Sequence, residues 1–175
     1  MELQSLLLMD GVLPDPTLAE VTEVFASNVA FHRLSGDFPD PEQVRPDQVA
    51  AVLGAESQTP SSEILLLRDR TDALAGVVFL LHEHPDPADT FPWIGLLMTH
   101  RELHGLGYGR RAVELVEARL RAAGRGGVRL AVLENNTAAL GFWTALGYRE
   151  IDRRKDRELG RACFVLQKVF PGGEE

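Results

Sequence analysis

The sequence predicts an α+β fold: a mixed, mostly antiparallel sheet with one parallel strand–helix–strand step and flanking helices. Two pairs of apolar runs, each joined by a short polar turn, indicate antiparallel hairpins. Between these pairs, the apolar runs 93–99 and 127–133 enclose one amphipathic helical segment, and this connection leaves room only for a crossover to a parallel strand. A length of 175 residues, 45% of them hydrophobic, predicts a single domain over residues 1–175.

The N-terminal third predicts one strand and two helices. The apolar run Leu3–Met9 has the length of a strand. The segment Thr17–Leu34 carries apolar residues at helical spacing, and Thr17 and Glu20 form a capping box at its start. A stretch with glycine and prolines ends this helix, and Pro46–Gly54 predicts a second, shorter helix.

The middle of the chain predicts three consecutive strands. Residues 62–70 and 73–84 are apolar runs around a polar turn, which predicts a hairpin. A turn rich in proline and aspartate then leads into the strand Trp93–Thr99.

A helix with one buried face follows this strand. Ala112, Val116 and Leu120 recur at helical spacing on the face expected to be buried, and Gly124 ends the helix. The charged residues expected on the opposite, solvent-facing side are Arg110, Arg111, Glu114, Glu117 and Arg121. After the strand 127–133, a helix capped by Asn136 and ended by Gly147 leads into a C-terminal hairpin.

Composition narrows the function classes. A formal net charge of −8 argues against nucleic-acid binding, which requires a basic surface. No apolar run approaches the roughly 20 residues of a membrane span. Cys163 is the only cysteine and the N-terminal residues lack the basic start of a signal peptide, so we expect a cytoplasmic protein. The sequence leaves the oligomeric state open and is compatible with a homodimer.

The stretch "HGLGYGRR", residues 104–111, places glycines between a strand and a helix, where a phosphate is often bound. "GYGRRA" matches a dinucleotide-binding loop, but the polar "HREL" separates its first glycine from the strand, and the chain offers one parallel step instead of several. His100 and His104 have the spacing of a zinc-binding pair, but Arg101 stands where the glutamate of that motif belongs. We therefore expect no metal site.

A third interpretation explains more of the chain. "HGLGYG" (His104–Gly109) resembles the pyrophosphate loop Q/R-x-x-G-x-G/A of the GNAT family of N-acetyltransferases, with His104 at the first position. A second segment resembles the signature N-x-x-A-x-x-F-Y-x-x-x-G-F of that family through Asn136, Ala139, Phe142, Trp143, Gly147 and Tyr148. This resemblance implies an acyl-CoA N-acyltransferase fold and an enzyme that moves an acetyl group from acetyl-CoA to a primary amine of a small molecule or peptide.

The resemblance also implies a set of residues that bind coenzyme A. Glycines let a helix N-terminus approach the pyrophosphate, and the amide chain of pantetheine can pair with an exposed strand edge if the next parallel strand splays away. The strand residues expected at this edge are Leu97, Met98 and Thr99, with a backbone N–H near Met98 as donor to the reaction's oxyanion. The other expected residues are His104, Gly105, Leu106, Gly107, Tyr108, Gly109, Arg110, Asn136 and Trp143.

The sequence departs from the family at the catalytic positions. Trp143 replaces a tyrosine proposed as general acid, and an indole N–H cannot act as an acid near neutral pH. Two branches of the family carry a glutamate base at places that Trp93 and Ala131 occupy here. A catalytically silent acyl-CoA-binding module therefore stays open as an alternative.

A replacement base is expected from "HEH", residues 82–84. Antiparallel pairing of two strands would bring His82, Glu83 and His84 beside Trp93, which is expected to contact the acceptor. A histidine has an ordinary pKa of about 6.5, which suits a base near neutral pH. Two acidic segments are expected to frame the acceptor and to favour a cation: Asp37, Asp40 and Glu42, and Glu83, Asp86 and Asp89.

Overall fold

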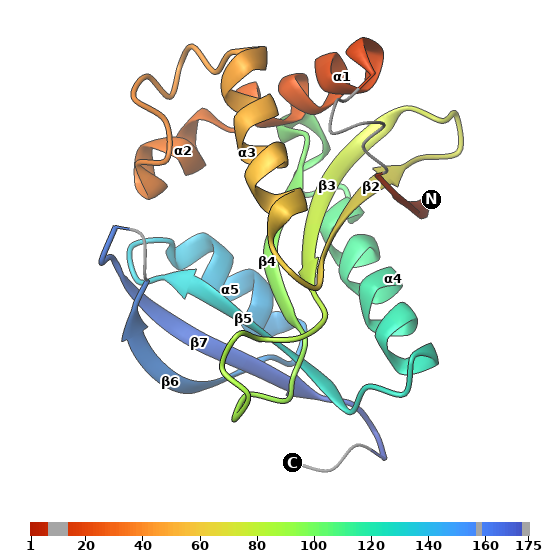
Figure 1. Cartoon of the computed structure of the whole chain (residues 1–175), viewed down its shortest axis with the longest axis vertical. Coiled ribbons are helices and arrows are strands. Elements are labelled where there is room, and N and C mark those ends of the chain that lie inside the picture. The colour runs from red at the N-terminus through yellow and green to blue at the C-terminus, as the bar shows by residue number, and fades with distance from the viewer. Residues whose placement is uncertain (7–13, 157–158, 173–175) are drawn as a thin grey trace.

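One seven-stranded sheet forms the centre of the molecule (Figure 1). The structure, a computed structural model, describes residues 1–6, 14–156 and 159–172. Neighbouring strands are antiparallel except for β4 and β5, which are parallel, and the order across the sheet is β1-β2-β3-β4-β5-β7-β6. The strands are β1 (Glu2–Ser5), β2 (Ser62–Arg68), β3 (Leu74–Leu81), β4 (Trp93–Thr99), β5 (Gly127–Leu133), β6 (Arg149–Lys155) and β7 (Ala162–Val169). The predicted fold class is confirmed.

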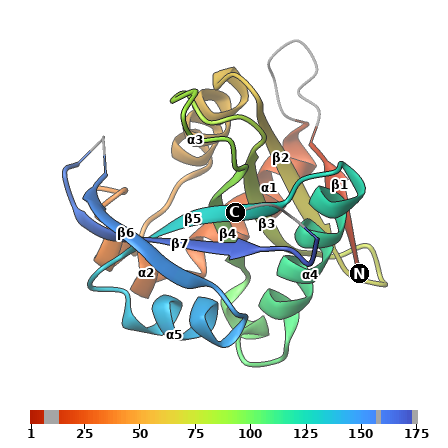
Figure 2. The same cartoon turned by 90° about the horizontal axis from the view of Figure 1, so that it is seen from below.

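Helices cover both faces of the sheet. Helices α1 (Asp15–Ala26) and α3 (Pro46–Gln58) pack through Phe25 and Leu53 on one face, with α2 (Val29–Ser35) beside them. Helices α4 (Tyr108–Ala122) and α5 (Thr137–Ala145) pack through Val116 and Trp143 on the other face. Figure 2 shows α3 on one side of the strand layer and α4 and α5 on the other. A 3₁₀ turn, η1 (Arg101–Leu103), links β4 to the glycine loop.

The helix predicted over Thr17–Leu34 is two helices, α1 and α2. Asn28 interrupts it, because its buried side chain donates hydrogen bonds to the Val24 carbonyl at 2.8 Å and to the Thr99 carbonyl at 3.0 Å. The second bond ties the junction to the end of β4. Such a long-range contact leaves no trace in the periodicity of the segment.

The predicted capping box is also wrong. Helix α1 begins at Asp15, with Pro14 as its N-cap and Pro16 in its first turn, so Thr17 lies inside the helix. Proline is favoured at the first helical positions because its fixed φ suits a helix and its missing N–H would have no partner there. Helix α3 continues past the expected end at Gly54 to Gln58.

The first strand is confirmed over Glu2–Ser5, and residues 7–9 of the prediction lie outside the described residues.

Glu117 is a further correction. It was expected on the solvent side of α4, but it is 3% exposed. Its carboxylate accepts hydrogen bonds from Lys168 at 2.7 Å, from Arg121 at 2.7 Å and from the Tyr148 hydroxyl at 3.2 Å.

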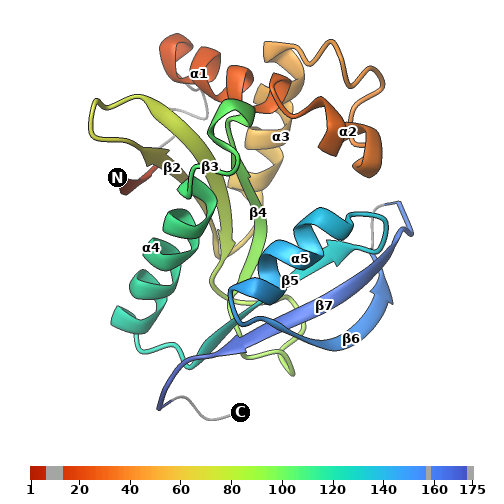
Figure 3. The ribbon, with the colours of Figure 1, turned by 180° about the vertical axis from the view of Figure 1, so that it is seen from behind.

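The parallel step opens almost as soon as it forms. Only Trp93↔Arg129 and Ile94↔Leu130 pair β4 with β5. Figure 3 shows the two strands diverging, with α4 beside one and α5 beside the other. The splay implied by the sequence resemblance is therefore present, and beyond Ile94 the edge of β4 that faces β5 is left without a neighbouring strand.

Candidate active site

A cleft of about 750 Å³ lies where β4 and β5 diverge. This volume falls within the range of small-molecule sites, roughly 300–1,000 Å³. Gly95 and Ala131 line it and are exposed although both belong to central strands of the sheet. The cleft also reaches the α1–α3 side of the sheet through Phe25 and the α5 side through Trp143, so it connects the two faces of the molecule. We call it the β4–β5 cleft.

The edge of β4 presents backbone groups to this cleft. The His100 N–H donates to the Ala75 carbonyl of β3 at 2.9 Å, and backbone groups along a strand point alternately to its two sides. The N–H and C=O groups of Thr99 and Leu97 therefore point away from β3, toward the gap. Gly95 has no partner in the β3 register, which marks a β-bulge where the gap begins.

This alternation refines the prediction of an oxyanion donor near Met98. The Met98 backbone groups point toward β3, whereas its side chain lines the cleft. The N–H that faces the gap belongs to the preceding residue, Leu97. Thr99 has a structural role as well, because its carbonyl accepts hydrogen bonds from Asn28 and from His104 at 3.1 Å.

The glycine loop connects the end of β4 to α4. His104 is held at both ring nitrogens: Nε2 lies 3.1 Å from the Thr99 carbonyl and Nδ1 lies 3.1 Å from an Arg101 nitrogen. Gly105 and Gly107 have φ of 77° and 87°, and Gly107 is the N-cap of α4. This backbone leaves the first N–H groups of α4, from Tyr108 onward, at an exposed helix N-terminus, which is a favourable place for an anion.

The remaining loop residues have different surroundings. Leu106 is 67% exposed. A Cβ on Gly109 would come within 3.3 Å of the Phe142 ring, so Gly109 lets α4 and α5 approach each other. Arg111 pairs with Glu114 at 3.1 Å along the helix, and Arg110 is exposed in the first turn. The loop therefore lies next to the α5 wall of the cleft, with Arg110 as the cation at its helix end.

Helix α5 supplies two of the predicted residues to the cleft. Asn136 caps the helix through Oδ1, which accepts from the Ala139 N–H at 3.1 Å, and it lines the cleft. Trp143 lines the cleft but is 7% exposed. Its ring packs edge-on against Phe142 at 5.1 Å and Tyr148 at 4.9 Å. These contacts make Trp143 part of the hydrophobic core as well as of the cleft wall.

Charged side chains line the part of the cleft formed by the end of α2, by α3 and by the turn between β6 and β7. Arg161 donates to Asp37 at 2.7 Å and to Asp156 at 2.8 Å, and it also bonds to the Ser35 carbonyl at the end of α2. The hydrogen bond from Arg161 holds the pKa of Asp156 far below its ordinary value. Asp37 belongs to the first acidic segment that the sequence predicted at the acceptor, and it lines the cleft together with Glu56 of α3.

The residues predicted as base lie elsewhere. None of His82, Glu83 and His84 is among the described residues that line the cleft. Of the three, His84 lies beside Trp93: its ring stacks on the Trp93 indole with centroids 5.2 Å apart. This group stands at the paired end of β4, where Trp93 Nε1 donates to Asp89 at 3.0 Å.

His82 also has a partner of its own. Its Nε2 lies 2.9 Å from a carboxylate oxygen of Glu63 on β2. Among the described residues, no group of three or more His, Cys, Asp or Glu side chains could hold a metal ion.

The sequence did not reveal His32, Glu56, Asp156 or Arg161 as cleft residues. His32 falls on the apolar stripe of its helical segment, four and seven residues from Asn28 and Phe25, and this position is the signal that could have revealed a buried histidine. Arg161 gave no such signal, because the contact that brings it to the cleft is with Asp37, 124 residues away, while its other partner, Asp156, lies in the same turn between β6 and β7.

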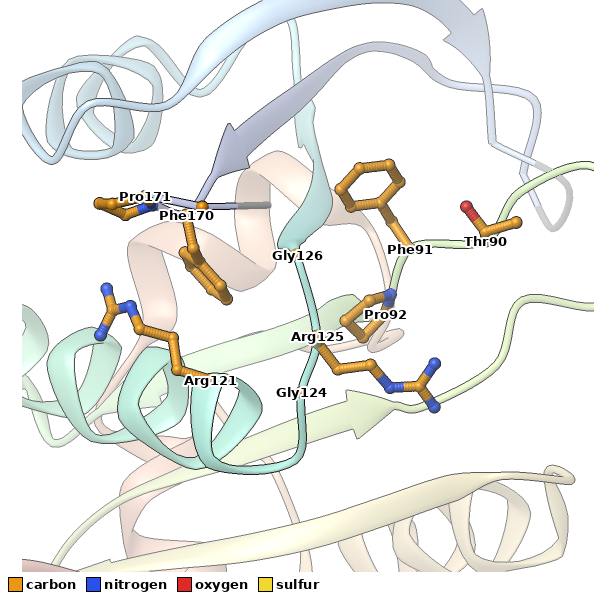
Figure 4. Close-up of a pocket in the computed structure, with 10 residues that line it drawn as sticks. Thr90, Phe91, Pro92, Arg121, Gly124, Arg125, Gly126, Phe170 and Pro171 are labelled. Atoms are coloured by element: carbon orange, nitrogen blue, oxygen red, sulfur yellow. The ribbon is translucent and has the colours of Figure 1, made fainter. Parts of the chain in front are cut away.

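A second cavity, of about 600 Å³, lies at the far end of α4 (Figure 4). Arg121 and Arg125 flank it, and Phe170 and Phe91 contribute rings. The Arg121 charge is already paired with buried Glu117 at 2.7 Å, and its guanidinium lies 4.5 Å from the centre of the Phe170 ring. Packing between α4 and the end of β7 therefore accounts for the Arg121 and Phe170 side chains of this cavity.

Solved structures share this architecture. The chain is similar to an acetyltransferase from Thermus thermophilus, with a TM-score of 0.73, 20% identity and coverage of 97% of this chain and 98% of that one. It is similar to the spermidine N-acetyltransferase of Vibrio cholerae in complex with CoA and spermine, with a TM-score of 0.67, 12% identity and coverage of 95% and 94%. A third similar structure is the ribosomal-protein-S18-alanine N-acetyltransferase of Escherichia coli, with a TM-score of 0.63, 13% identity and coverage of 95% and 92%.

At these identities the structures show the fold alone. No helix in the described part of the chain is long and apolar enough to cross a membrane.

The family model of the GNAT acetyltransferases matches residues 28–148, which span the splayed strands, the glycine loop and the α5 signature. The chain therefore belongs to the GNAT acetyltransferase family.

Proposed function

We propose that this protein transfers the acetyl group of acetyl-CoA to a primary amine. The observation that carries the proposal is the divergence of β4 from β5, which leaves one edge of β4 free along the β4–β5 cleft, together with the exposed helix N-terminus that follows this strand at Gly107. A pyrophosphate would lie at the N-terminus of α4, where helix N–H groups and Arg110 favour negative charge. The pantetheine amides would pair with the backbone N–H and C=O of Leu97 and with the N–H of Thr99, whose carbonyl already accepts from Asn28 and His104, as an added strand pairs with a sheet edge.

The gap-facing N–H groups also suit the chemistry. Attack of an amine on a thioester develops negative charge on the carbonyl oxygen, and a fixed N–H donor stabilises that charge. The Leu97 N–H is placed for this role near the bulge at Gly95. A thiol has a pKa of about 8.5, so its thiolate leaves without strong acid assistance. The replacement of the family's tyrosine by the packed Trp143 is therefore compatible with turnover.

The charged part of the cleft, where we place the acceptor and which we call the acceptor side, favours a cationic amine. Asp37, Asp156 and Glu56 line the cleft there, and Arg161 is the cation that accompanies them. The excess of carboxylates over cations attracts positive charge, as the overall charge of −8 also does. Three of the similar structures are of the spermidine N-acetyltransferase of Vibrio cholerae, two of them variants or a chimera of it, which makes short polyamines reasonable first probes.

The proposal is tested by following release of the CoA thiol from acetyl-CoA in the presence of purified protein. Putrescine and n-butylamine form a matched pair of equal chain length, and only putrescine carries a second cation. We expect amine-dependent release with both amines and a higher kcat/KM for putrescine. A protein that binds CoA but releases none above the amine-free rate would be the silent module. Equal kcat/KM for the two amines would contradict the role of the acidic residues.

A further inference from the structure

The proposed reaction requires a base, since an alkylamine has a pKa of about 10.4 and is protonated near pH 7. Most titratable side chains of the β4–β5 cleft are poor candidates. The pKa of Asp156 is lowered by its bond to Arg161. Burial raises the pKa of the Cys163 thiol, which keeps it protonated. The Glu56 carboxylate already accepts a hydrogen bond from Ser62.

His32 of α2 is different. It lines the cleft, is 1% exposed and is surrounded by phenylalanines, of which Phe38 lies 4.7 Å away edge-on and Phe25 lies 6.0 Å away in a stacked arrangement. Its Nε2 lies 2.8 Å from the Phe25 carbonyl. A carbonyl can only accept, so Nε2 carries the proton and Nδ1 presents a lone pair.

That lone pair has no partner. Among the described residues, Nδ1 of His32 is the buried side-chain nitrogen or oxygen that lacks a hydrogen bond. Leaving a buried polar atom without a partner is unfavourable, and such atoms in native proteins call for an explanation. His32 is one of the residues that line the cleft, and a donor brought there by the acceptor would give this nitrogen its missing partner.

We propose that His32 is the general base of the acetyl transfer, accepting a proton at Nδ1 from the acceptor's ammonium group directly or through one water molecule. This inference rests on the proposed function. The neutral amine then forms a C–N bond to the thioester carbon, the C–S bond breaks, and the departing thiolate takes a proton from the new amide nitrogen. The imidazolium afterwards returns its proton to solvent, so the net release is one proton for each acetyl group transferred.

The surroundings of His32 support both of its protonation states. Burial lowers the pKa of His32 and so keeps the ring neutral and ready to accept, while the Phe25 carbonyl and the charge of Asp37 oppose this shift. The charged groups that line the cleft with it are Asp37 after α2, Glu56 of α3, and Asp156 and Arg161 between β6 and β7. The carboxylates outnumber the one cation, which favours the imidazolium once it forms.

Two substitutions separate a base from a packing residue. His32→Phe keeps an aromatic ring among the phenylalanines, and His32→Gln keeps an N–H that can donate to the Phe25 carbonyl. With acetyl-CoA and putrescine, we expect both variants to lose about 10²–10⁴-fold in kcat/KM and to lose the histidine limb of the pH profile, with unchanged CoA affinity. The matched control is Arg33→Ala, the next residue on α2, whose exposed side chain pairs with Glu42.

Two other results would contradict the assignment of His32 as the base, and a third would contradict the transferase proposal. Retained turnover and an unchanged pH profile in folded His32→Phe and His32→Gln would overturn the assignment. So would loss of that limb in a His82→Ala/His84→Ala double variant while His32→Phe keeps it. If wild-type protein releases no CoA with either amine, the transferase proposal itself fails, and the base role with it.

A spectroscopic measurement covers the case in which neither variant folds. In ¹⁵N spectra of the wild-type imidazoles, His32 must be neutral with its proton on Nε2 at pH 7. Its Nδ1 resonance must move when putrescine is added to the CoA-bound protein. A proton on Nδ1 in the free protein, or an Nδ1 resonance that putrescine leaves unchanged, would overturn the proposal.

Discussion

At the scale of single residues, the β4–β5 cleft depends on small side chains at its centre. Gly95 and Ala131 face the gap from opposite strands, and both are exposed. Ala131 occupies a place where the sequence resemblance implies a glutamate base in one branch of the family, so this position supplies no carboxylate to the cleft. Under the proposed function a base must come from elsewhere in the cleft, where Nδ1 of His32 lacks a hydrogen-bond partner among the described residues.

His32 should make stability depend on pH. Its pKa is lowered in the folded protein because burial disfavours the charged ring, so the unfolded chain binds a proton at higher pH than the folded protein does. The contribution of neutral His32 to the free energy of unfolding is complete above the ordinary pKa of about 6.5. It is lost as the pH falls through the lower pKa that His32 has in the folded protein. We expect urea unfolding to show a smaller loss of stability on acidification in His32→Phe than in wild type. Parallel losses in the two proteins would contradict the shifted pKa.

At the scale of secondary structure, α4 begins and ends at a glycine in the left-handed region. Gly107 has φ of 87° at the N-terminus, and Gly124 has φ of 74° just after the C-terminus. A Cβ on either glycine would meet no described atom within 4 Å. The two positions therefore carry the same backbone requirement at opposite ends of one helix, and only Gly107 adjoins the proposed phosphate site.

This symmetry allows a controlled test of the loop. Gly107→Ala and Gly124→Ala should each lower the free energy of unfolding by about 1–2 kcal/mol, because L-residues are strained in the left-handed region. Only Gly107→Ala should also weaken CoA binding, by at least ~10-fold or about 1.4 kcal/mol, since its Cβ occupies the space a phosphate would approach. Calorimetric titration with CoA distinguishes the two variants, and equal affinities in both would remove the phosphate role of the loop.

The elements could be predicted from sequence where the signals are local. The periodicity of α4, the glycines at its ends and the cap at Asn136 all act within one turn, and the structure confirms each. The break between α1 and α2 could not be predicted, because it depends on Asn28 reaching Thr99 across the fold. The same reason hides Glu117, whose partner Lys168 is 51 residues away.

In the candidate site, too, short local motifs could be predicted from the sequence, whereas residues that the fold brings together could not. The glycine loop and the β4 edge follow from short motifs, and Leu97 and Met98 of that edge line the cleft. The role of the loop in binding coenzyme A stays a prediction. The predicted base "HEH" lies at the paired end of β4, and its catalytic role stays a prediction that the structure does not support with a position in the cleft. His32 and Arg161 enter the cleft only because α2 and the β6–β7 hairpin meet across it.

At the scale of the whole molecule, two halves of the sheet meet at a narrow joint. Strands β1–β4 and β5–β7–β6 are linked by the two residue pairs between β4 and β5. Buried Glu117 strengthens this joint from α4, since it binds Lys168 of β7 and the Tyr148 hydroxyl before β6. Burial and the charge of Glu117 raise the pKa of Tyr148 far above its ordinary value, which keeps the hydroxyl a hydrogen-bond donor.

Removal of this carboxylate should therefore weaken the whole fold. Glu117→Ala leaves Lys168 and the Tyr148 hydroxyl without their buried partner, and we expect a loss of about 3–5 kcal/mol in the free energy of unfolding. Glu114→Ala, one turn earlier on the exposed face, should cost about 0–1 kcal/mol because its pair with Arg111 is solvated. Chemical denaturation of both variants tests this difference, and similar losses would show that Glu117 does not secure the joint.

The position of bound coenzyme A decides the proposed function most directly, and amide hydrogen exchange measures that position. With CoA bound, we expect slower exchange at the gap-facing amides of Leu97 and Thr99 and in the first turn of α4, from Tyr108 onward, with no change at Gly124–Gly126 beside the second cavity. NADH at the same concentration should produce no such protection. Exchange at Leu97 and Thr99 that is unaffected by CoA, or equal protection by NADH, would contradict the proposed path of acetyl-CoA through the β4–β5 cleft.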